Sequence, residues 1–227
     1  MTAVSLKTAN GVVALEFSDG SSLLFSPDYL PEGSFPGGGF PEGERLVSWE
    51  SAPSEAAAGI PGREFSPGEE EALRFAADCY RVEKLALRLI ARAEQHSLGL
   101  TAKLERRGSR AAVVRAVISR LLDRNLLDDG RYAELWIRSR LALRKAPSPR
   151  WLRASLRKRG IDRNSLSAAL DGVLDPETEY ALLLRYLESR NSRKKMRERE
   201  GKKGSFLRSE LRYEGFSSAA IDRYLDE

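Results

Sequence analysis

Cysteine and histidine are nearly absent from this sequence, which has one residue of each among 227. The single cysteine, Cys79, cannot form an internal disulfide, and its place in an apolar helical stretch predicts a buried structural thiol. The single histidine, His96, is accompanied by no paired-cysteine motif of the kind that binds zinc. We therefore expect no metal and no other cofactor.

Long apolar runs are also missing. No stretch reaches the roughly 18 apolar residues that are needed to cross a bilayer. The first residues lack the charged-then-apolar layout of a secretion signal. We therefore expect a cytoplasmic protein without a membrane partner. The 41% hydrophobic content is enough to fill the core of one large domain or two small ones.

Signatures of catalysis are lacking as well. The glycine-rich stretches at 33–40 and 200–205 do not have the lysine and hydroxyl spacing of a phosphate-binding loop. No nucleophile with a histidine partner is evident. These observations predict that the protein is not an enzyme.

Basic side chains, in contrast, are abundant and unevenly distributed. Residues 1–71 carry 3 basic and 12 acidic side chains, a net charge of −9, whereas residues 72–227 carry 35 basic and 21 acidic ones, a net charge of +14. Of these 35, 27 are arginine, which binds phosphate and carboxylate groups bidentately. The basic part predicts a polyanionic partner, either nucleic acid or an acidic protein surface. The alternative is a helical surface whose charges only solvate it.

The first thirty residues predict a small antiparallel β meander. Three short strand-like runs are joined at Asn10-Gly11 and Asp19-Gly20, dipeptides that supply positive φ in tight hairpin turns. Residues 31–65 follow as a linker rich in glycine and proline. Because residues 1–65 are acidic, we expect them to fold back on the basic helices and to compete weakly with polyanions.

From Ser66 onward the sequence is typical of helices. Ser66, Pro67 and Glu69 predict a capping box with proline at the first helical position. Three segments further along superimpose without a gap, with glycines at 108, 160 and 215. Their spacing of about fifty residues predicts three-helix repeats at 66–127, 128–174 and 175–227.

The repeat glycines predict tight turns between short helices. Gly160 and Gly215 should have positive φ and should close Schellman turns, each with an apolar contact across the turn. The contacting pairs are Leu156 with Ile161 and Leu211 with Phe216. At Gly108 the apolar position holds Ser109, so we expect a looser turn there.

The adjacent carboxylates Asp128 and Asp129 raise the question of a metal or acid–base site, but their context predicts the start of a helix. Asp128 suits the N-cap position, and Asp129 lies where a negative charge favours the positive end of the helix dipole. Leu127 and Tyr132 take the positions of a hydrophobic staple around this start. We interpret the pair as structural.

With these segments assembled, the chain resembles the RecX family, bacterial regulators of the RecA recombinase. The matching stretches occur in family order at 86–97, 126–140, 148–162 and 206–216. The resemblance implies a mainly α fold of three tandem three-helix repeats in an elongated, curved array, preceded here by the β meander. It also implies binding along the groove of the RecA–DNA filament, which restrains filament growth, ATP hydrolysis, strand exchange and coprotease activity. Such a role belongs to recombination, DNA repair and the SOS response, and we expect a monomer.

Basic residues of the second and third repeats are candidate contacts for the RecA filament and for DNA, mainly single-stranded DNA and also double-stranded DNA. They are expected along the exposed stripe of one long helix, along the mostly exposed side of the next helix opposite Trp151, Leu152 and Leu156, and in the basic loop at 192–203. On the long helix these are Arg131, Arg138 and Lys145; on the next, Arg150, Arg153, Arg157 and the adjacent Lys158; in the loop, Arg193, Lys194, Lys195, Lys202 and Lys203.

Two alternatives stand beside this interpretation. Three helices around a tight turn resemble a helix-turn-helix that reads DNA sequence. However, the helices after Gly160 and Gly215 offer few side chains for base edges. The second alternative is a purely structural helical scaffold.

Overall fold

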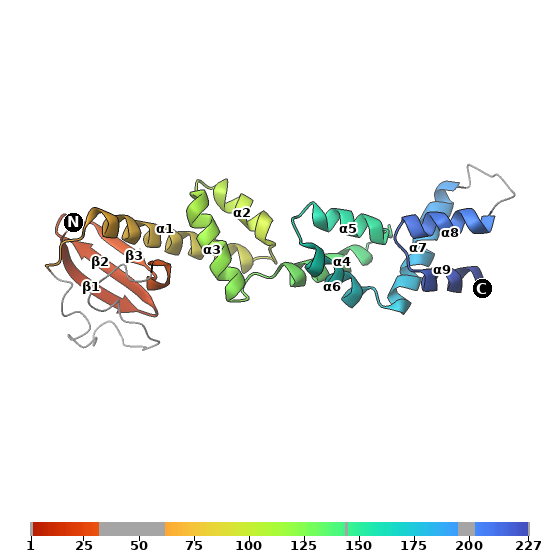
Figure 1. Cartoon of the computed structure of the whole chain (residues 1–227), viewed down its shortest axis with the longest axis horizontal. Coiled ribbons are helices and arrows are strands. Elements are labelled where there is room, and N and C mark those ends of the chain that lie inside the picture. Colours follow the sequence, from red (N-terminus) through yellow and green to blue (C-terminus); the bar gives the residue numbers. More distant parts are fainter. Residues whose placement is uncertain (1, 32–61, 144, 195–202, 227) are drawn as a thin grey trace. The chain divides into compact units, whose positions relative to one another are not determined.

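The computed structural model describes residues 2–31, 62–143, 145–194 and 203–226. These residues form a mainly helical fold with one small sheet, as the sequence predicts (Figure 1). The strands are β1 (Ala3–Ala9), β2 (Val12–Phe17) and β3 (Ser22–Phe25), followed by the short 3-10 helix η1 (Pro27–Tyr29). The α-helices are α1 (Pro67–Ile90), α2 (Ser97–Glu105), α3 (Ala111–Asp123), α4 (Asp129–Leu141), α5 (Pro149–Arg157), α6 (Arg163–Val173), α7 (Pro176–Lys194), α8 (Lys203–Tyr213) and α9 (Ser218–Asp226).

Contacts between residues divide the chain into two compact units. One unit comprises residues 1–93 and 100–126, and the other comprises residues 94–99 and 127–227. The first therefore holds the sheet with α1, α3 and most of α2, whereas the second holds α4 to α9. The short segment 94–99 belongs to the second unit, although residues 100–126 of the first unit separate it in sequence from the rest of that unit.

The N-terminal meander has the predicted topology. Its strands are antiparallel in the order β1–β2–β3. Asn10 and Gly11, between β1 and β2, have φ of 52° and 70°, and Gly20, between β2 and β3, has φ of 79°. These positive values confirm both hairpin turns, since the right-handed twist of paired strands favours turns of this hand.

The sheet covers α1 within its own unit. Leu15 and Phe17 of β2 and Phe25 of β3 are buried, and both β3 and η1 contact α1. Residues 2–31 therefore pack on α1 through apolar side chains, whereas our expectation was based on the attraction of acidic residues to basic helices. Most of the segment predicted as a linker, residues 32–61, lies outside the described residues.

A polar cluster joins η1 to α1 and α3. Asp28 accepts hydrogen bonds from Arg120 and Arg124, and the Arg120 guanidinium lies 4.9 Å from the ring centre of Tyr29. The Nε atom of Arg120 is 3.5 Å from the carboxylate of Glu83, which is buried. Burial lowers the pKa of Arg120 and raises that of Tyr29. These contacts attach the short N-terminal segment to the helices.

The start of α1 confirms the predicted capping box. The Ser66 hydroxyl accepts a hydrogen bond from the Glu69 N–H, and the Glu69 carboxylate accepts one from the Ser66 N–H at 2.8 Å. Pro67 occupies the first helical position. Further along, Cys79 is fully buried, and burial raises its pKa to about 12. The prediction of a structural thiol is confirmed.

The turns at Gly160 and Gly215 are Schellman turns. The two φ values are 80° and 88°. At the first, Gly160 N–H donates to the Arg157 carbonyl at 2.9 Å and Ile161 N–H donates to the Leu156 carbonyl at 3.3 Å. The equivalent pair of hydrogen bonds closes the turn at Gly215. The apolar residues on both sides of each turn are buried, as predicted: Leu156, Ile161, Leu211 and Phe216.

The first repeat does not have the looser turn that we expected. Gly108 has φ of 85°, its N–H donates to the Glu105 carbonyl at 2.8 Å, and Ser109 N–H donates to the Leu104 carbonyl at 3.3 Å. The expectation was wrong because the two backbone bonds require positive φ but not an apolar side chain after the glycine. A further turn of this kind ends α3 at Asn125, with φ of 55°, which the sequence interpretation missed.

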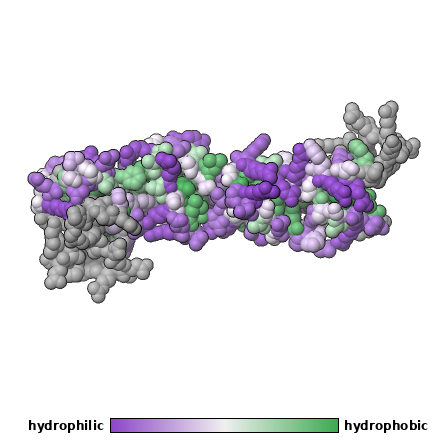
Figure 2. Space-filling view, viewed as in Figure 1, coloured by the Kyte–Doolittle hydropathy of each residue, from purple (hydrophilic) through white to green (hydrophobic). Residues whose placement is uncertain are grey.

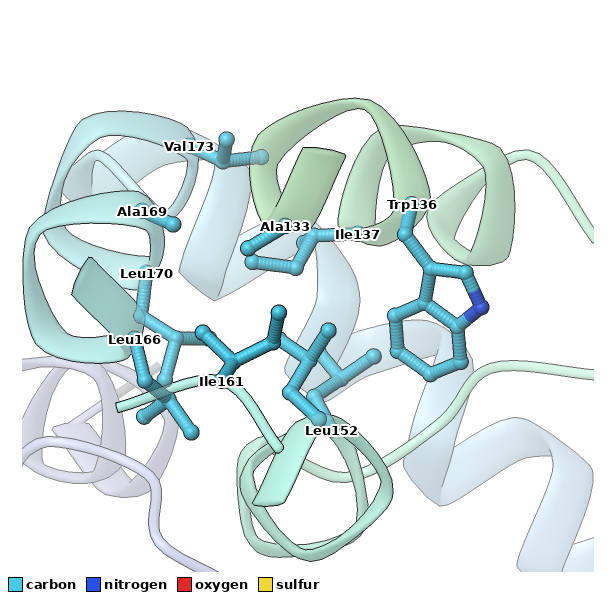
Figure 3. Packing of buried hydrophobic residues seen from close by; sticks show 10 residues of the cluster. Ala133, Trp136, Ile137, Leu152, Ile161, Leu166, Ala169, Leu170 and Val173 are labelled. Atoms are coloured by element: carbon cyan, nitrogen blue, oxygen red, sulfur yellow. The ribbon is translucent and has the colours of Figure 1, made fainter. Parts of the chain in front are cut away.

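The core of α4, α5 and α6 lies where helical periodicity predicts it (Figure 3). Ile137 from α4, Leu152 from α5 and Leu170 from α6 point toward one another, with Trp136 at one end of the cluster. The last three helices have their own core, which includes Leu183 and the Schellman residues of the Gly215 turn. Helices α4 and α5, which carry candidate basic residues, are thus held by one apolar cluster, and α7 to α9 are held by another.

Candidate functional site

The paired carboxylates Asp128 and Asp129 each serve the start of a helix. Asp128 is the N-cap of α4, and its carboxylate accepts a hydrogen bond from the Arg131 N–H at 2.9 Å. The Asp129 carboxylate accepts two bonds at the start of α2, from the Ser97 N–H at 2.7 Å and from the Ser97 hydroxyl at 2.6 Å. The predicted N-cap at Asp128 is confirmed, and the bond from Ser97 to Asp129 adds an unpredicted contact between residues 32 positions apart.

Neither a metal site nor a membrane span emerges from the described part of the chain. There, no group of three or more histidine, cysteine, aspartate or glutamate side chains is placed to hold a metal ion. No described helix combines the length and the apolar character that a bilayer crossing requires.

Of the three predicted repeats, the second has the highest net charge. Residues 128–174 carry 11 basic and 5 acidic side chains, a net charge of +6, whereas residues 66–127 have a net charge of +4 and residues 175–227 of +1. On the face shown in Figure 2, hydrophilic residues cover much of the region of α4 to α6. A polyanion would be attracted most strongly to this repeat.

The three cations assigned to the long helix α4 do not form one row. Arg131 donates to the Glu94 carboxylate at 2.8 Å, and Arg138 lies 3.6 Å from the Glu134 carboxylate one turn away. Lys145 is not on this helix, since α4 ends at Leu141. The expectation of a common stripe is therefore wrong for Lys145, because the chain turns into a loop before it.

On α5 the predicted row is divided between contacts inside the protein and free surface. The Arg150 guanidinium lies 3.6 Å from the ring centre of Tyr213, and an Nη atom of Arg153 lies 3.5 Å from the carbonyl of Gly215. Arg153 is half-buried rather than mostly exposed, which corrects our expectation. The reason is that the turn between α8 and α9 packs against the start of α5, where Arg150 N–H also donates to the Glu214 carbonyl.

Arg157 and Lys158, at the end of α5, differ from the residues before them. Both side chains are exposed, and neither makes a hydrogen bond or an ion pair with any part of the chain that the structure describes. Of the candidates near the basic loop, Lys195 and Lys202 lie outside the described residues. For Arg193, Lys194 and Lys203 the structure describes the helical backbone alone.

Two tryptophan rings and two arginines form a stack in the same part of the chain. Trp136 and Trp151 are stacked with ring centres 5.7 Å apart and an interplanar angle of 21°. The guanidinium groups of Arg140 and Arg159 lie 5.0 Å and 4.6 Å from the Trp136 ring centre. The sequence interpretation placed Trp151 on the apolar face of α5, but it is 48% exposed. The sequence did offer one signal for this stack, because Trp136 and Arg140 are four residues apart and therefore lie on the same face of a helix.

Comparison with known proteins identifies the family. The family model described as "RecX, second three-helix domain" matches residues 128–170. "Regulatory protein RecX" of Treponema pallidum (strain Nichols) is 37% identical over 124 residues, which cover 54% of this chain and 75% of that protein. The protein of the same name from Mycobacterium sp. (strain KMS) is 34% identical over 149 residues, which cover 66% and 75%. This chain belongs to the RecX family.

Solved RecX structures agree in fold. "Crystal structure of regulatory protein RecX" matches with a TM-score of 0.66 and 17% identity, covering 100% of this chain and 99% of the other. RecX from Lactobacillus salivarius matches with a TM-score of 0.50 and 24% identity, covering 66% and 95%. The family-model match falls on α4 to α6, so the most basic repeat is the part of the chain in which the RecX domain is recognised.

Proposed function

We propose that this chain is a non-enzymatic, monomeric, cytoplasmic regulator that binds the RecA–DNA filament. It restrains filament growth, ATP hydrolysis and the recombinase and coprotease activities of RecA. Membership of the RecX family supports the regulatory part of this proposal, since the relatives are named regulatory proteins. The filament partner rests on the family resemblance and on the basic charge of the helical repeats.

The observation that carries the proposal is the pair Arg157 and Lys158. Most other described cations of the second repeat have a partner within the protein, such as Glu94 for Arg131. In contrast, Arg157 and Lys158 extend from the most basic repeat without an intramolecular partner in the described chain. Exposed cations of this kind contact phosphates or acidic side chains at little cost in desolvation.

The first test measures ATP hydrolysis by RecA assembled on single-stranded DNA. The parent protein is expected to slow hydrolysis, and the double substitution Arg157→Glu with Lys158→Glu is expected to weaken that effect. A matched control reverses Arg106 and Arg107, which lie beside the equivalent turn of the first repeat and are also exposed. If the parent leaves hydrolysis and filament length unchanged, the proposed function is wrong.

The salt dependence of binding to bare single-stranded DNA identifies the partner of this surface. If Arg157 and Lys158 contact phosphates, losing each contact should flatten the logarithmic salt dependence by about 0.7. If they contact acidic RecA side chains, charge reversal should weaken binding to the filament while the salt slope for bare DNA stays unchanged. A strong preference for one duplex sequence would instead favour a helix-turn-helix reader.

A further inference from the structure

A cavity of about 420 Å³ opens beside α5 within the second unit. The loop between α4 and α5 forms one side, with Leu143, Lys145 and Ser148, while Trp151 of α5 and Tyr186 of α7 form others. The Arg185 guanidinium holds this loop by donating to the Leu141 and Leu143 carbonyls at 2.8 Å and 2.6 Å. The cavity is therefore built from elements that are fastened to one another.

The aromatic rings of the cavity are held in place before any ligand arrives. The Trp151 ring stacks on Trp136, and the backbone N–H of Trp151 donates to the hydroxyl of Ser148, the N-cap of α5. Tyr186 packs against Phe216 with ring centres 5.5 Å apart. Nevertheless Trp151 remains 48% exposed, which is unusual for a ring of this size. A rigid, exposed aromatic ring favours binding, because little conformational freedom is lost when a partner packs on it.

The charge of the cavity is positive. Arg140 and Lys145 line it, and no lining residue is acidic. The Arg140 guanidinium lies over the Trp136 ring, and its Nε atom is buried with no hydrogen-bond partner among the described residues. The Lys145 side chain is exposed and likewise has no partner in the part of the chain that the structure describes. The cavity therefore combines a π surface with two cations that lack a counter-charge.

We propose that this cavity binds one base of single-stranded DNA, stacked on Trp151, with the adjoining phosphate at Lys145 and Arg140. A base offers a planar π face and its phosphodiester supplies the negative charge, which together match the two properties of the cavity. The base of a duplex is already stacked and cannot enter, so the site selects single strands. The inference rests on the proposed function in taking DNA as a partner of this chain.

The test compares two oligonucleotides of equal length and charge, oligo(dT) and its abasic counterpart, each binding to the full chain in a fluorescence anisotropy titration. The parent should bind oligo(dT) more tightly. Trp151→Ala should weaken binding to oligo(dT) by about 5- to 150-fold, the range that corresponds to loss of one base–aromatic stack. Binding to the abasic strand should stay unchanged. Trp151→Phe should retain most of the preference.

Two further variants distinguish the loss of stacking from a general effect of removing an aromatic ring and from the loss of a charge. Phe206→Ala removes an aromatic side chain of α8 that is 66% exposed and lies outside the cavity, and it should leave both affinities unchanged. Lys145→Gln should weaken binding to both strands and flatten the salt dependence, since the phosphate is common to them. The Lys145→Gln variant tests the site even if the Trp151→Ala protein does not fold.

Several results would overturn the inference. Equal affinity of the parent for the two strands excludes a base pocket. A folded Trp151→Ala protein that binds both strands like the parent, yet no longer slows RecA, shows that the cavity takes a protein side chain instead. Failure of the parent to slow RecA contradicts the proposed function but leaves the base preference measurable. The two failures are therefore distinguishable.

Discussion

The three repeat glycines have the same backbone conformation but differ in the space around them. Their φ values lie between 80° and 88°. A Cβ atom built on Gly108 meets no other atom within 4 Å, whereas one on Gly215 lies 2.8 Å from an Nη atom of Arg153 and 3.2 Å from the backbone nitrogen of Arg150. Gly108 is therefore needed only for its positive φ, whereas Gly215 is needed both for its positive φ and for the close packing around it.

Substitution of these glycines should reveal the difference. Gly108→Ala should cost about 1–2 kcal/mol, the typical penalty of a left-handed conformation for a residue with a Cβ. Gly215→Ala should cost more, because the backbone of α5 cannot move away as a flexible side chain can. Scanning calorimetry of the two variants against the parent measures both effects. Equal losses would show that packing at Gly215 adds nothing.

The bond between Asp129 and Ser97 gives a second prediction for single residues. Asp129→Ala leaves the Ser97 N–H without its acceptor and should cost about 1–3 kcal/mol. In a double-mutant cycle with Ser97→Ala, the two losses should be non-additive by about 0.5 kcal/mol or more. Asp128→Ala, which removes the cap of α4, should cost about 0.5–2 kcal/mol and be additive with Ser97→Ala. Additivity in both cycles would contradict the assignment of Asp129.

Residues were predictable where their role depends on near neighbours. The caps at Ser66 and Asp128 and the positive φ of the glycines follow from bonds that span two to five residues. The partners of Asp129 and Arg150 were not predictable, since they lie 32 and 63 positions away and no local pattern pairs them. The same limit explains why the basic row of α5 was assigned to free surface, although half of it packs against another turn.

At the scale of elements, α6 and α7 each begin at an aspartate whose carboxylate accepts hydrogen bonds from the first turn of the helix. The Asp162 carboxylate accepts hydrogen bonds from the N–H groups of Asn164 and Ser165, and Asp175 accepts those of Glu177 and Thr178. The hydroxyl of Ser165, followed by these backbone bonds, holds the pKa of the Asp162 carboxyl below its ordinary value of 3.8, and the N–H and hydroxyl of Thr178 do the same for Asp175. Each cap is therefore strongest when ionised.

The lowered pKa values predict loss of stability in acid. A carboxyl with a lower pKa in the folded state binds fewer protons there than in the unfolded chain. Its contribution is therefore complete above its unfolded pKa and is lost as the pH falls through the folded value. Melting temperatures at about pH 6 and about pH 3 should differ less in the variant Asp162→Asn with Asp175→Asn than in the parent. At the higher pH the variant should melt near the parent, because asparagine is also a good N-cap. An equal acid shift in both proteins would contradict the assignment.

Helices and strands were largely predictable because their signals are local. Asn-Gly and Asp-Gly turns defined the meander, and apolar residues at helical spacing defined the core of α4 to α6. The end of α4 at Leu141 was not predicted, since no glycine or proline marks it before Pro147. Consequently the cavity beside Trp151, which depends on the loop after α4, had no counterpart in the sequence interpretation.

At the scale of the whole molecule, the single cysteine provides a probe of one unit. Cys79 is fully buried in α1, and its pKa of about 12 leaves little thiolate at neutral pH. Its reaction with a thiol reagent should be on the order of a thousandfold slower in the folded protein than in the unfolded chain. Rapid labelling under native conditions would show that the first unit opens readily. Variants confined to the second unit, such as Asp162→Asn, serve as the control and should not change the rate.

The opposite charges of the two ends of the sequence lead to a last prediction, and the structure changes how it must be tested. Deleting residues 1–65 would remove the strands that cover α1, so a truncation would confuse charge with loss of packing. Glu64 and Glu71 are exposed, and Glu64→Gln with Glu71→Gln removes two charges without touching the core. If the acidic end weakens the attraction of polyanions, this variant should bind single-stranded DNA a few-fold more tightly at low salt. The difference should vanish near 1 M salt, where the Debye length falls to about 3 Å. A folded variant that binds equally or more weakly at low salt would show that the acidic segment does not compete with DNA, and that the basic repeats act independently of it.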